Sequence, residues 1–215
     1  MPDFLPDVVF LCPLDAKRAW LSLVPLNPGK VRLEYTKDAG KRWEEKIAPI
    51  SDGESAPISF LDDNRGFLLS LGGPAAGAME KHLYGTEDSG NHWHLLADLP
   101  ISGCYPTGVV FRTKADGWIT ATYHGGDSAP LYRSGDGGKT WHLHQFPIPG
   151  DYQGGYADTY PPVFTGFQKH RGYLPVKLVR DVPEPRHWAW VTYESNDGGK
   201  SWHLPASGVQ SYLDD

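Results

Sequence analysis

Short runs of hydrophobic and β-branched residues alternate along the chain with clusters of Gly, Pro, Asp, Asn and Ser. One such run is Trp118–Tyr123, and the turn residues Gly125–Ser128 separate it from the next run, Leu131–Ser134. Runs of this length, bounded by turn residues, are typical of β-strands and not of helices. The runs recur in groups of four. The pattern therefore predicts an all-β fold built from four-stranded antiparallel units.

Four aligned segments mark the last turn of each group: TKDAGKRW, TEDSGNHW, SGDGGKTW and SNDGGKSW. Asp accepts local backbone N–H bonds and Gly supplies positive φ, so each segment predicts a hairpin turn between the third and fourth strands. The aspartates lie 50, 48 and 61 residues apart. We expect a structural role for the four aspartates and the four tryptophans of these segments: Asp38, Trp43, Asp88, Trp93, Asp136, Trp141, Asp197 and Trp202.

Repeated four-stranded units are typical of the blades of a β-propeller. We expect a single domain over residues 1–215, with blades at about 8–50, 57–99, 107–148 and 161–206. The strands of the fourth blade are expected at Val163–Phe167, Gly172–Val179, Trp188–Ser195 and Ser201–Leu204. Three architectures stay open: a small four-bladed ring, an arc that completes itself by dimerisation, or part of a larger propeller.

The Ser/Thr-x-Asp-x-Gly-x-x-Trp segment resembles the Asp-box, also called the bacterial neuraminidase repeat (BNR), and the resemblance covers about residues 8–205. This repeat occurs in sialidases, xyloglucanase-type glycoside hydrolases, sortilin-type receptors and photosystem II assembly factors. The resemblance implies a propeller whose Asp-boxes lie on the face opposite the functional site. It implies no single activity, because these families share the box and not the chemistry.

Composition and charge narrow the function classes. Gly 25 and Pro 19, with 40% hydrophobic residues, fit a turn-rich β-protein and argue against disorder and helical bundles. The net charge of -6 argues against a general nucleic-acid binder. No apolar run reaches the roughly 18 residues of a membrane helix. No signal peptide is expected, because only a short apolar run follows Asp3 and Asp7. The compartment stays open, although the relatives implied by the resemblance are often exported.

No metal or cofactor is expected. Cys12 and Cys104 are too few for a disulfide framework. The HWH and HLH segments each place two histidines on one side of a strand, whereas a closed zinc site needs four ligands. The chain also has no phosphate-binding glycine loop.

The candidate site residues come from two enlarged segments on the face opposite the Asp-boxes, around 147–162 and 180–187. Aromatic rings suited to stacking and basic groups suited to charged contacts make Tyr152, Tyr156, Tyr160, Arg180 and Arg186 the candidate ligand-binding residues. The candidate acidic catalytic residues are Asp151, Asp158, Asp181 and Glu184.

We expect a non-catalytic propeller that binds a glycan or a protein partner on the face opposite the Asp-boxes, and that self-associates if the ring is not closed. One alternative is a glycoside hydrolase of the sialidase-like superfamily, which would need two carboxylates roughly 5–10 Å apart. The Phe/Tyr-Arg-Ile-Pro signature that the resemblance requires for a sialidase is absent. A second alternative is a scaffold similar to the photosystem II assembly factors, with a protein partner.

Overall fold

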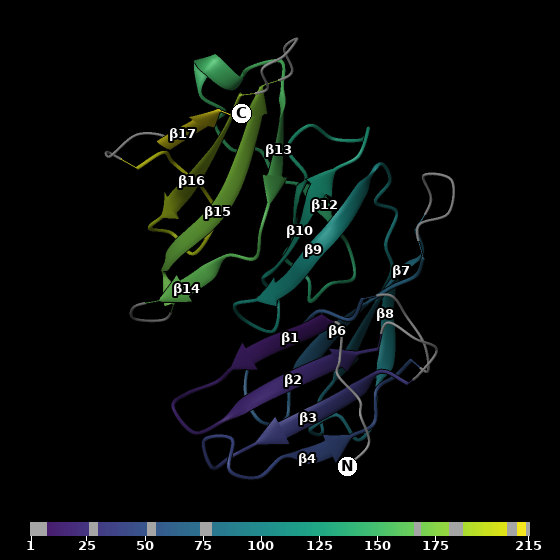
Figure 1. The fold of residues 1–215 in the computed structure, drawn as a ribbon. Coiled ribbons are helices and arrows are strands. Elements are labelled where there is room, and N and C mark those ends of the chain that lie inside the picture. The colour runs from purple at the N-terminus through teal and green to yellow at the C-terminus, as the bar shows by residue number, and fades with distance from the viewer. Residues whose placement is uncertain are drawn as a thin grey trace.

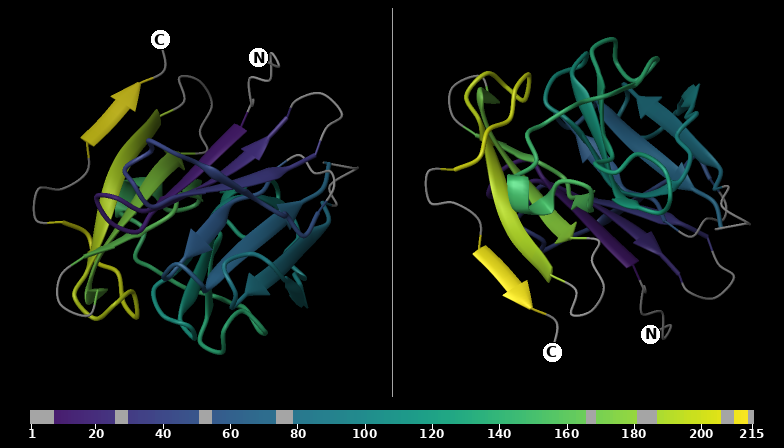
Figure 2. Two further views of the ribbon diagram at one scale, coloured as in Figure 1. Left: turned by 90° about the horizontal axis from the view of Figure 1, so that it is seen from below. Right: turned by 90° about the horizontal axis from the view of Figure 1, so that it is seen from above.

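The computed structural model describes residues 8–25, 30–50, 55–73, 79–165, 169–180 and 187–205, together with the backbone of 210–213. The described elements are strands and one 3-10 turn at Gly150–Tyr152, so the all-β prediction is confirmed. The strands form four antiparallel sheets, which follow one another through the molecule in chain order (Figure 1, Figure 2).

Three of the sheets contain four strands each, paired in sequence order. The first contains β1 (Val8–Pro13), β2 (Ala19–Val24), β3 (Arg32–Thr36) and β4 (Glu44–Lys46). The second contains β5 (Ile58–Phe60), β6 (Gly66–Leu71), β7 (Lys81–Thr86) and β8 (His94–Asp98). The third contains β9 (Cys104–Phe111), β10 (Gly117–Tyr123), β11 (Leu131–Ser134) and β12 (His142–Leu143).

The fourth sheet differs in detail from its predicted strands. It contains β13 (Tyr156–Thr159), β14 (Val163–Thr165), β15 (Arg171–Arg180), β16 (His187–Ser195) and β17 (Gln210–Leu213). Both β13 and β14 pair with the long strand β15, so part of the predicted loop 147–162 is a strand. Pro161 and Pro162 separate β13 from β14, because proline has no N–H to donate to the ladder.

The predicted fourth strand, Ser201–Leu204, contributes one isolated bridge, between Glu194 and His203. Strand β17 instead pairs with the first half of β16. The predicted strand at Val163–Phe167 is thus present as β14 over Val163–Thr165, with Phe167 outside the described residues, whereas the predicted strand at Ser201–Leu204 was wrong.

Each Asp-box segment forms the same turn. The Ser or Thr hydroxyl donates to the aspartate Oδ1 at 2.8–3.0 Å and accepts the N–H of the box glycine at 2.8–3.1 Å. The same Oδ1 accepts the N–H of the residue four positions later at 2.9–3.0 Å. The hydroxyl and the carboxylate thus satisfy turn groups that no strand partner could reach.

Consecutive sheets are joined by contacts between aromatic rings, which are stacked at two junctions and tilted at the third. Trp20 of the first sheet stacks on Phe60 of the second, with 3.9 Å between ring centroids. Phe67 of the second sheet stacks on Phe111 of the third at 3.5 Å. Trp118 of the third sheet lies against Phe164 of the fourth at 4.7 Å. At each junction one ring thus belongs to the second residue of β2, β6 or β10, and the other ring is a phenylalanine of the next sheet.

A glycine beside each receiving phenylalanine permits this contact. A Cβ at Gly66 would lie 2.3 Å from the ring of Phe60, and a Cβ at Gly117 would lie 2.6 Å from Phe111. Gly172 has the same relation to Phe164, at 2.9 Å. In the first sheet this position is Ala19, which is paired with Pro13 and not with a phenylalanine.

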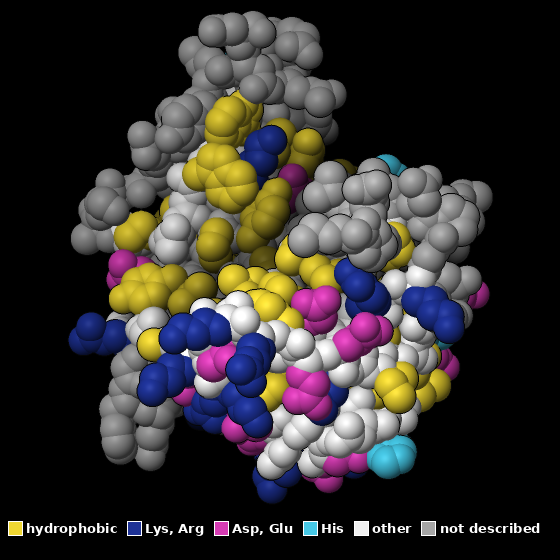
Figure 3. Space-filling model, turned by 60° about the horizontal axis from the view of Figure 1, so that its bottom comes forward, with side chains coloured by type: hydrophobic (Ala, Val, Ile, Leu, Met, Phe, Trp, Pro, Cys, Tyr) yellow, Lys and Arg dark blue, Asp and Glu magenta, His cyan; other side chains and the backbone are white. Residues whose placement is uncertain are grey.

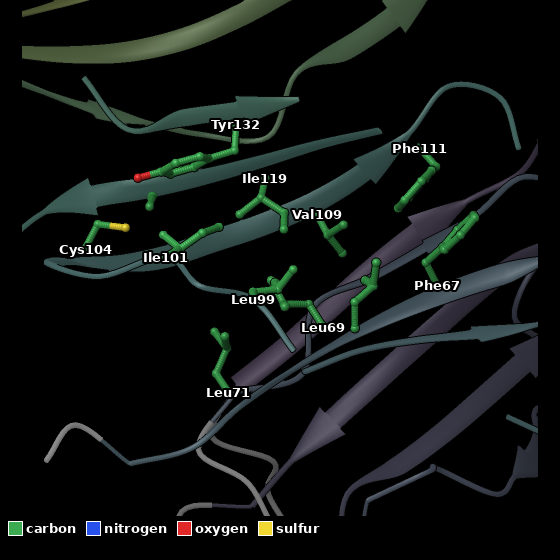
Figure 4. Packing of buried hydrophobic residues seen from close by; sticks show 12 residues of the cluster. Phe67, Leu69, Leu71, Leu99, Ile101, Cys104, Val109, Phe111, Ile119 and Tyr132 are labelled. Atoms are coloured by element: carbon green, nitrogen blue, oxygen red, sulfur yellow. The ribbon is translucent and has the colours of Figure 1, made fainter. Parts of the chain in front are cut away.

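Hydrophobic clusters continue each stack toward the opposite end of the junction. Between the second and third sheets, Phe67 and Phe111 lie at one end of the cluster, and Cys104 and Tyr132 lie at the other (Figure 4). A second cluster joins the third and fourth sheets, and a third joins the first and second. Three similar junctions thus hold the four sheets together.

We expect Asp136→Asn to lower the free energy of unfolding at neutral pH. We also expect this free energy to fall less in acid than it does in the parent protein. Hydrogen bonds from the side chain and the N–H of Thr140 lower the pKa of Asp136 to about 2, against 3.8 ordinarily. The stabilisation by the carboxylate is therefore complete above about pH 4 and is lost as the pH falls toward about 2. Urea unfolding across this range measures the effect, and an unchanged acid dependence in the variant would contradict it.

Candidate functional site

The fourth sheet has one broad face that the described sheets leave largely exposed, although its Tyr156 end contacts β10. Alternate residues of a strand point to opposite faces, and Leu174, Val176 and Leu178 of β15 are buried against the third sheet. The intervening residues of β15, with their neighbours on β13, β14 and β16, point away from it. We call this set, with Tyr160, the outer face: Tyr156, Asp158, Tyr160, Val163, Thr165, Arg171, Tyr173, Pro175, Lys177, Val179, Trp188, Trp190, Thr192 and Glu194.

Aromatic rings dominate the outer face. The rings of Tyr160 and Trp190 lie 5.1 Å apart, and Tyr156 stacks on Tyr123 of β10 at 4.7 Å. Trp190 keeps 40% of its surface exposed, although it is in the middle of β16. In Figure 3, hydrophobic side chains gather over the upper half of the view, whereas charged side chains crowd the lower half.

Two charged groups lie among these rings. The Nζ of Lys177 lies 5.1 Å from the centroid of the Trp188 ring, within cation–π range. Asp158 is paired with Lys177 across β13 and β15, and its Oδ1 accepts the N–H of Tyr123 at 2.8 Å. Burial raises the pKa of Asp158, and the Tyr123 hydrogen bond and the Lys177 charge oppose this only in part. This part of the face thus combines ring surfaces with one ammonium and one partly desolvated carboxylate, and Arg171 and Glu194 carry further charges beside Tyr173.

Comparisons with known proteins identify the repeat. The profile of the BNR/Asp-box repeat family matches residues 193–204, which include the fourth box. The chain carries the Asp-box repeat. Its four sheets are the blades of a β-propeller fold. No curated protein sequence matches this Asp-box propeller.

Several solved structures are similar to the Asp-box propeller. The endo-arabinase of Bacteroides thetaiotaomicron matches 100% of this chain and 82% of its own, with 13% identity and a TM-score of 0.52. A structure of YCF48 bound to D1 peptide matches 95% of this chain and 84% of its own, with 16% identity and a TM-score of 0.48. Trypanosoma rangeli sialidase matches 92% of this chain and 36% of its own, with 13% identity and a TM-score of 0.47. At such identities the similarity concerns the fold and not the activity.

The structure distributes the candidate residues of the Asp-box propeller over different places. Tyr156, Asp158 and Tyr160 lie together on the outer face. Tyr152 is buried between the third and fourth sheets, with 7% of its surface exposed. Asp151 and Arg180 are exposed, in the 3-10 turn and at the end of β15. Three candidates, Asp181, Glu184 and Arg186, lie outside the described residues.

The sequence analysis did not single out Trp188, Trp190 and Lys177. A signal was present, because two tryptophans separated by one residue in a strand must share a face. The segment was assigned as a strand, but which face of that strand lacked a covering sheet could be read only from the structure.

Metal and membrane sites find no support in the described part of the chain. There, no group of three or more His, Cys, Asp or Glu side chains is arranged to hold a metal ion. His92, from one of the histidine pairs, instead bonds through Nδ1 to the box carboxylate of Asp88 at 2.6 Å. No helix among the described residues is long and apolar enough to cross a membrane.

We expect Asp158→Asn to raise stability at neutral pH. A carboxyl group whose pKa is raised on folding ionises at a cost to the folded state, which grows as the pH rises above the ordinary value of 3.8. Asparagine keeps an oxygen that can accept the Tyr123 N–H and avoids this cost. Urea unfolding should show an advantage that disappears below about pH 4, opposite to Asp136→Asn. A variant less stable than the parent at neutral pH would contradict the expectation.

Proposed function

We propose that this Asp-box propeller is a non-catalytic binding protein, and that the outer face of the fourth sheet holds another protein chain. The observation that carries the proposal is the exposure of large hydrophobic side chains together on one sheet face. Val163, Trp190 and Tyr173 are 58%, 40% and 37% exposed. Exposed apolar surface gathered in one place is typical of protein interfaces, whereas single exposed residues are not.

The residue types of the outer face support a protein partner. Tryptophan and tyrosine are enriched among the residues that dominate binding energy at interfaces. Thr192 and Glu194 lie beside the aromatic residues on β16 and supply polar groups at its edge. The face begins at Tyr156 and Trp188, at the ends of the strands opposite the Asp-boxes.

A glycan is the second candidate ligand. The adjacent rings of Tyr160 and Trp190 offer surfaces for the C–H faces of a sugar. Asp158 and Lys177 lie close by, with groups that can accept or donate hydrogen bonds to hydroxyls. Glycoside hydrolysis is the enzymatic alternative, and turnover of a glycan by the parent protein would overturn the non-catalytic assignment.

A photo-reactive phenylalanine analogue at position 190 tests the proposal. Illumination in cells of the natural source should link the propeller covalently to a protein chain, because this position is expected at the centre of the interface. The matched control is Leu95, an exposed hydrophobic residue of β8 with 54% of its surface exposed. Cross-linking at position 190 no stronger than at position 95 would contradict protein binding.

The variant Trp190→Ala completes this test. With the same probe placed at position 173, we expect Trp190→Ala to abolish capture, because interface tryptophans contribute about 2 kcal/mol or more to the binding free energy. Thermal stability should be nearly unchanged. Leu95→Ala should leave capture intact. If Trp190→Ala removes binding to a glycan array and has no effect on protein capture, the glycan replaces the protein as the ligand.

A further inference from the structure

The three junctions within the chain define what a complete junction needs. One sheet presents an aromatic residue next to the start of its second strand: Trp20, Phe67 or Trp118. The following sheet presents a phenylalanine at or next to the end of its inner strand: Phe60, Phe111 or Phe164. Trp20 and Trp118 have 0% of their surface exposed, and Phe67 has 5%.

The fourth sheet carries the presenting half of a further junction. Tyr173 follows Gly172 in β15 as Phe67 follows Gly66 in β6. Its ring is 37% exposed, and among the described residues no aromatic ring lies against it. Tyr173 therefore occupies the stacking position with no receiving sheet in front of it.

The first sheet carries the receiving half. Pro13 is paired with Ala19 as Phe60 is paired with Gly66, and Leu11 is paired with Leu21 as Ile58 is paired with Leu68. The receiving sides of the first and second sheets nevertheless differ sharply in how far they are buried. Ile58 is 7% exposed, whereas Leu11 is 62% exposed.

Other residues on the same side of the first sheet are also uncovered. Val9, which lies two residues before Leu11 on β1, is 49% exposed. The box tryptophan Trp43 is 38% exposed, whereas Trp202 of the fourth box is 4% exposed against Phe164. Within the described part of the chain, the first and fourth sheets thus each present an exposed face, one of the receiving type and one of the presenting type.

Polar groups at the first junction show which charged groups the two exposed faces would bring together. Tyr35 is paired with Trp20, and its hydroxyl donates to the Oδ1 of Asp63 at 2.8 Å. In the fourth sheet Glu194 is paired with Tyr173, so it takes the place of Tyr35.

The counterpart of Asp63 in the first sheet follows from the loop lengths. The segments 13–19 and 60–66 have the same length, and the aspartate at the third position of each accepts two backbone N–H bonds. Asp63 then corresponds to Ala16, and the exposed Lys17 follows it. A junction of the same kind would therefore bring Glu194 of the fourth sheet close to Ala16 and Lys17 of the first, with Arg171 two residues before Tyr173 on the same face as Glu194.

We propose that the protein partner of the outer face is a second copy of this chain, whose first sheet packs against the fourth sheet as consecutive sheets do within the chain. The inference rests on the proposed function of this face. Each copy carries both halves, so two copies can make two such contacts and close on each other. The contacts repeat an arrangement that the chain already forms three times.

Light scattering after size-exclusion chromatography of the purified chain tests the inference, with dilution to obtain a dissociation constant. The expected mass is twice the 23.8 kDa of one chain. Glu194→Lys and Lys17→Glu should each weaken dimerisation about tenfold, and the double variant should restore it, because the two charges face each other. Tyr173→Ala should weaken it by about tenfold or more, and Leu95→Ala should have no effect.

A monomer at all concentrations, or a mass that grows without limit, would overturn the two-copy assembly. So would a dimer that neither single charge variant weakens. The failures are distinguishable: a monomer that still cross-links through position 190 to a different protein leaves the proposed function standing. A monomer with no cross-link at that position removes both. Circular dichroism melting confirms that the variants, all at exposed or half-exposed positions, remain folded.

Discussion

The aromatic contact between consecutive sheets is the constraint on which the arrangement of this protein depends. A four-stranded sheet has two faces, and each must find a hydrophobic neighbour. Here the neighbour is always the next sheet, and the rings of Trp20 on Phe60, Phe67 on Phe111 and Trp118 on Phe164 join one sheet to the next. The glycine beside each phenylalanine lets that ring lie flat over its own sheet, so that the preceding sheet can approach. The Asp-box turn closes the outer hairpin at the same end, where Trp141 meets Phe111 edge to face at 6.0 Å.

The same constraint applies to the first and the last of the four sheets. A series of four sheets has three internal junctions and leaves one sheet face uncovered at each end. The uncovered face of the first sheet presents Val9 and Leu11, and that of the fourth presents Tyr173 and Trp190. The candidate binding surface and the end of the repeat are therefore the same surface. The requirement that hydrophobic sheet faces be covered links the fold to the proposed function.

Much of this architecture could be predicted from the sequence, because the repeat is local. The Asp-box turns depend on residues within eight positions of one another, and their hydrogen bonds are nearly identical in all four copies. The fourth sheet was harder to predict. Pro161 and Pro162 divide its inner strand, and β17 pairs with β16 across a stretch of chain that local sequence patterns do not connect.

The candidate site was predicted only in part. Tyrosines near one another in the chain proved to lie on opposite faces: Tyr152 packs inward, and Tyr156 lies on the outer face. A side chain's face depends on strand register, which is set by the pairing partner.

The central claim, that stacked rings couple neighbouring sheets, is tested most directly by a double-mutant cycle on Phe67 and Phe111. Their centroids lie 3.5 Å apart with an angle of 8° between the rings, and each belongs to a different sheet. Urea unfolding of Phe67→Leu, Phe111→Leu and the double variant gives the coupling energy. The account predicts about 0.5–1.5 kcal/mol of favourable coupling. Strictly additive losses would show that the two rings contribute only their separate burial, and would contradict it.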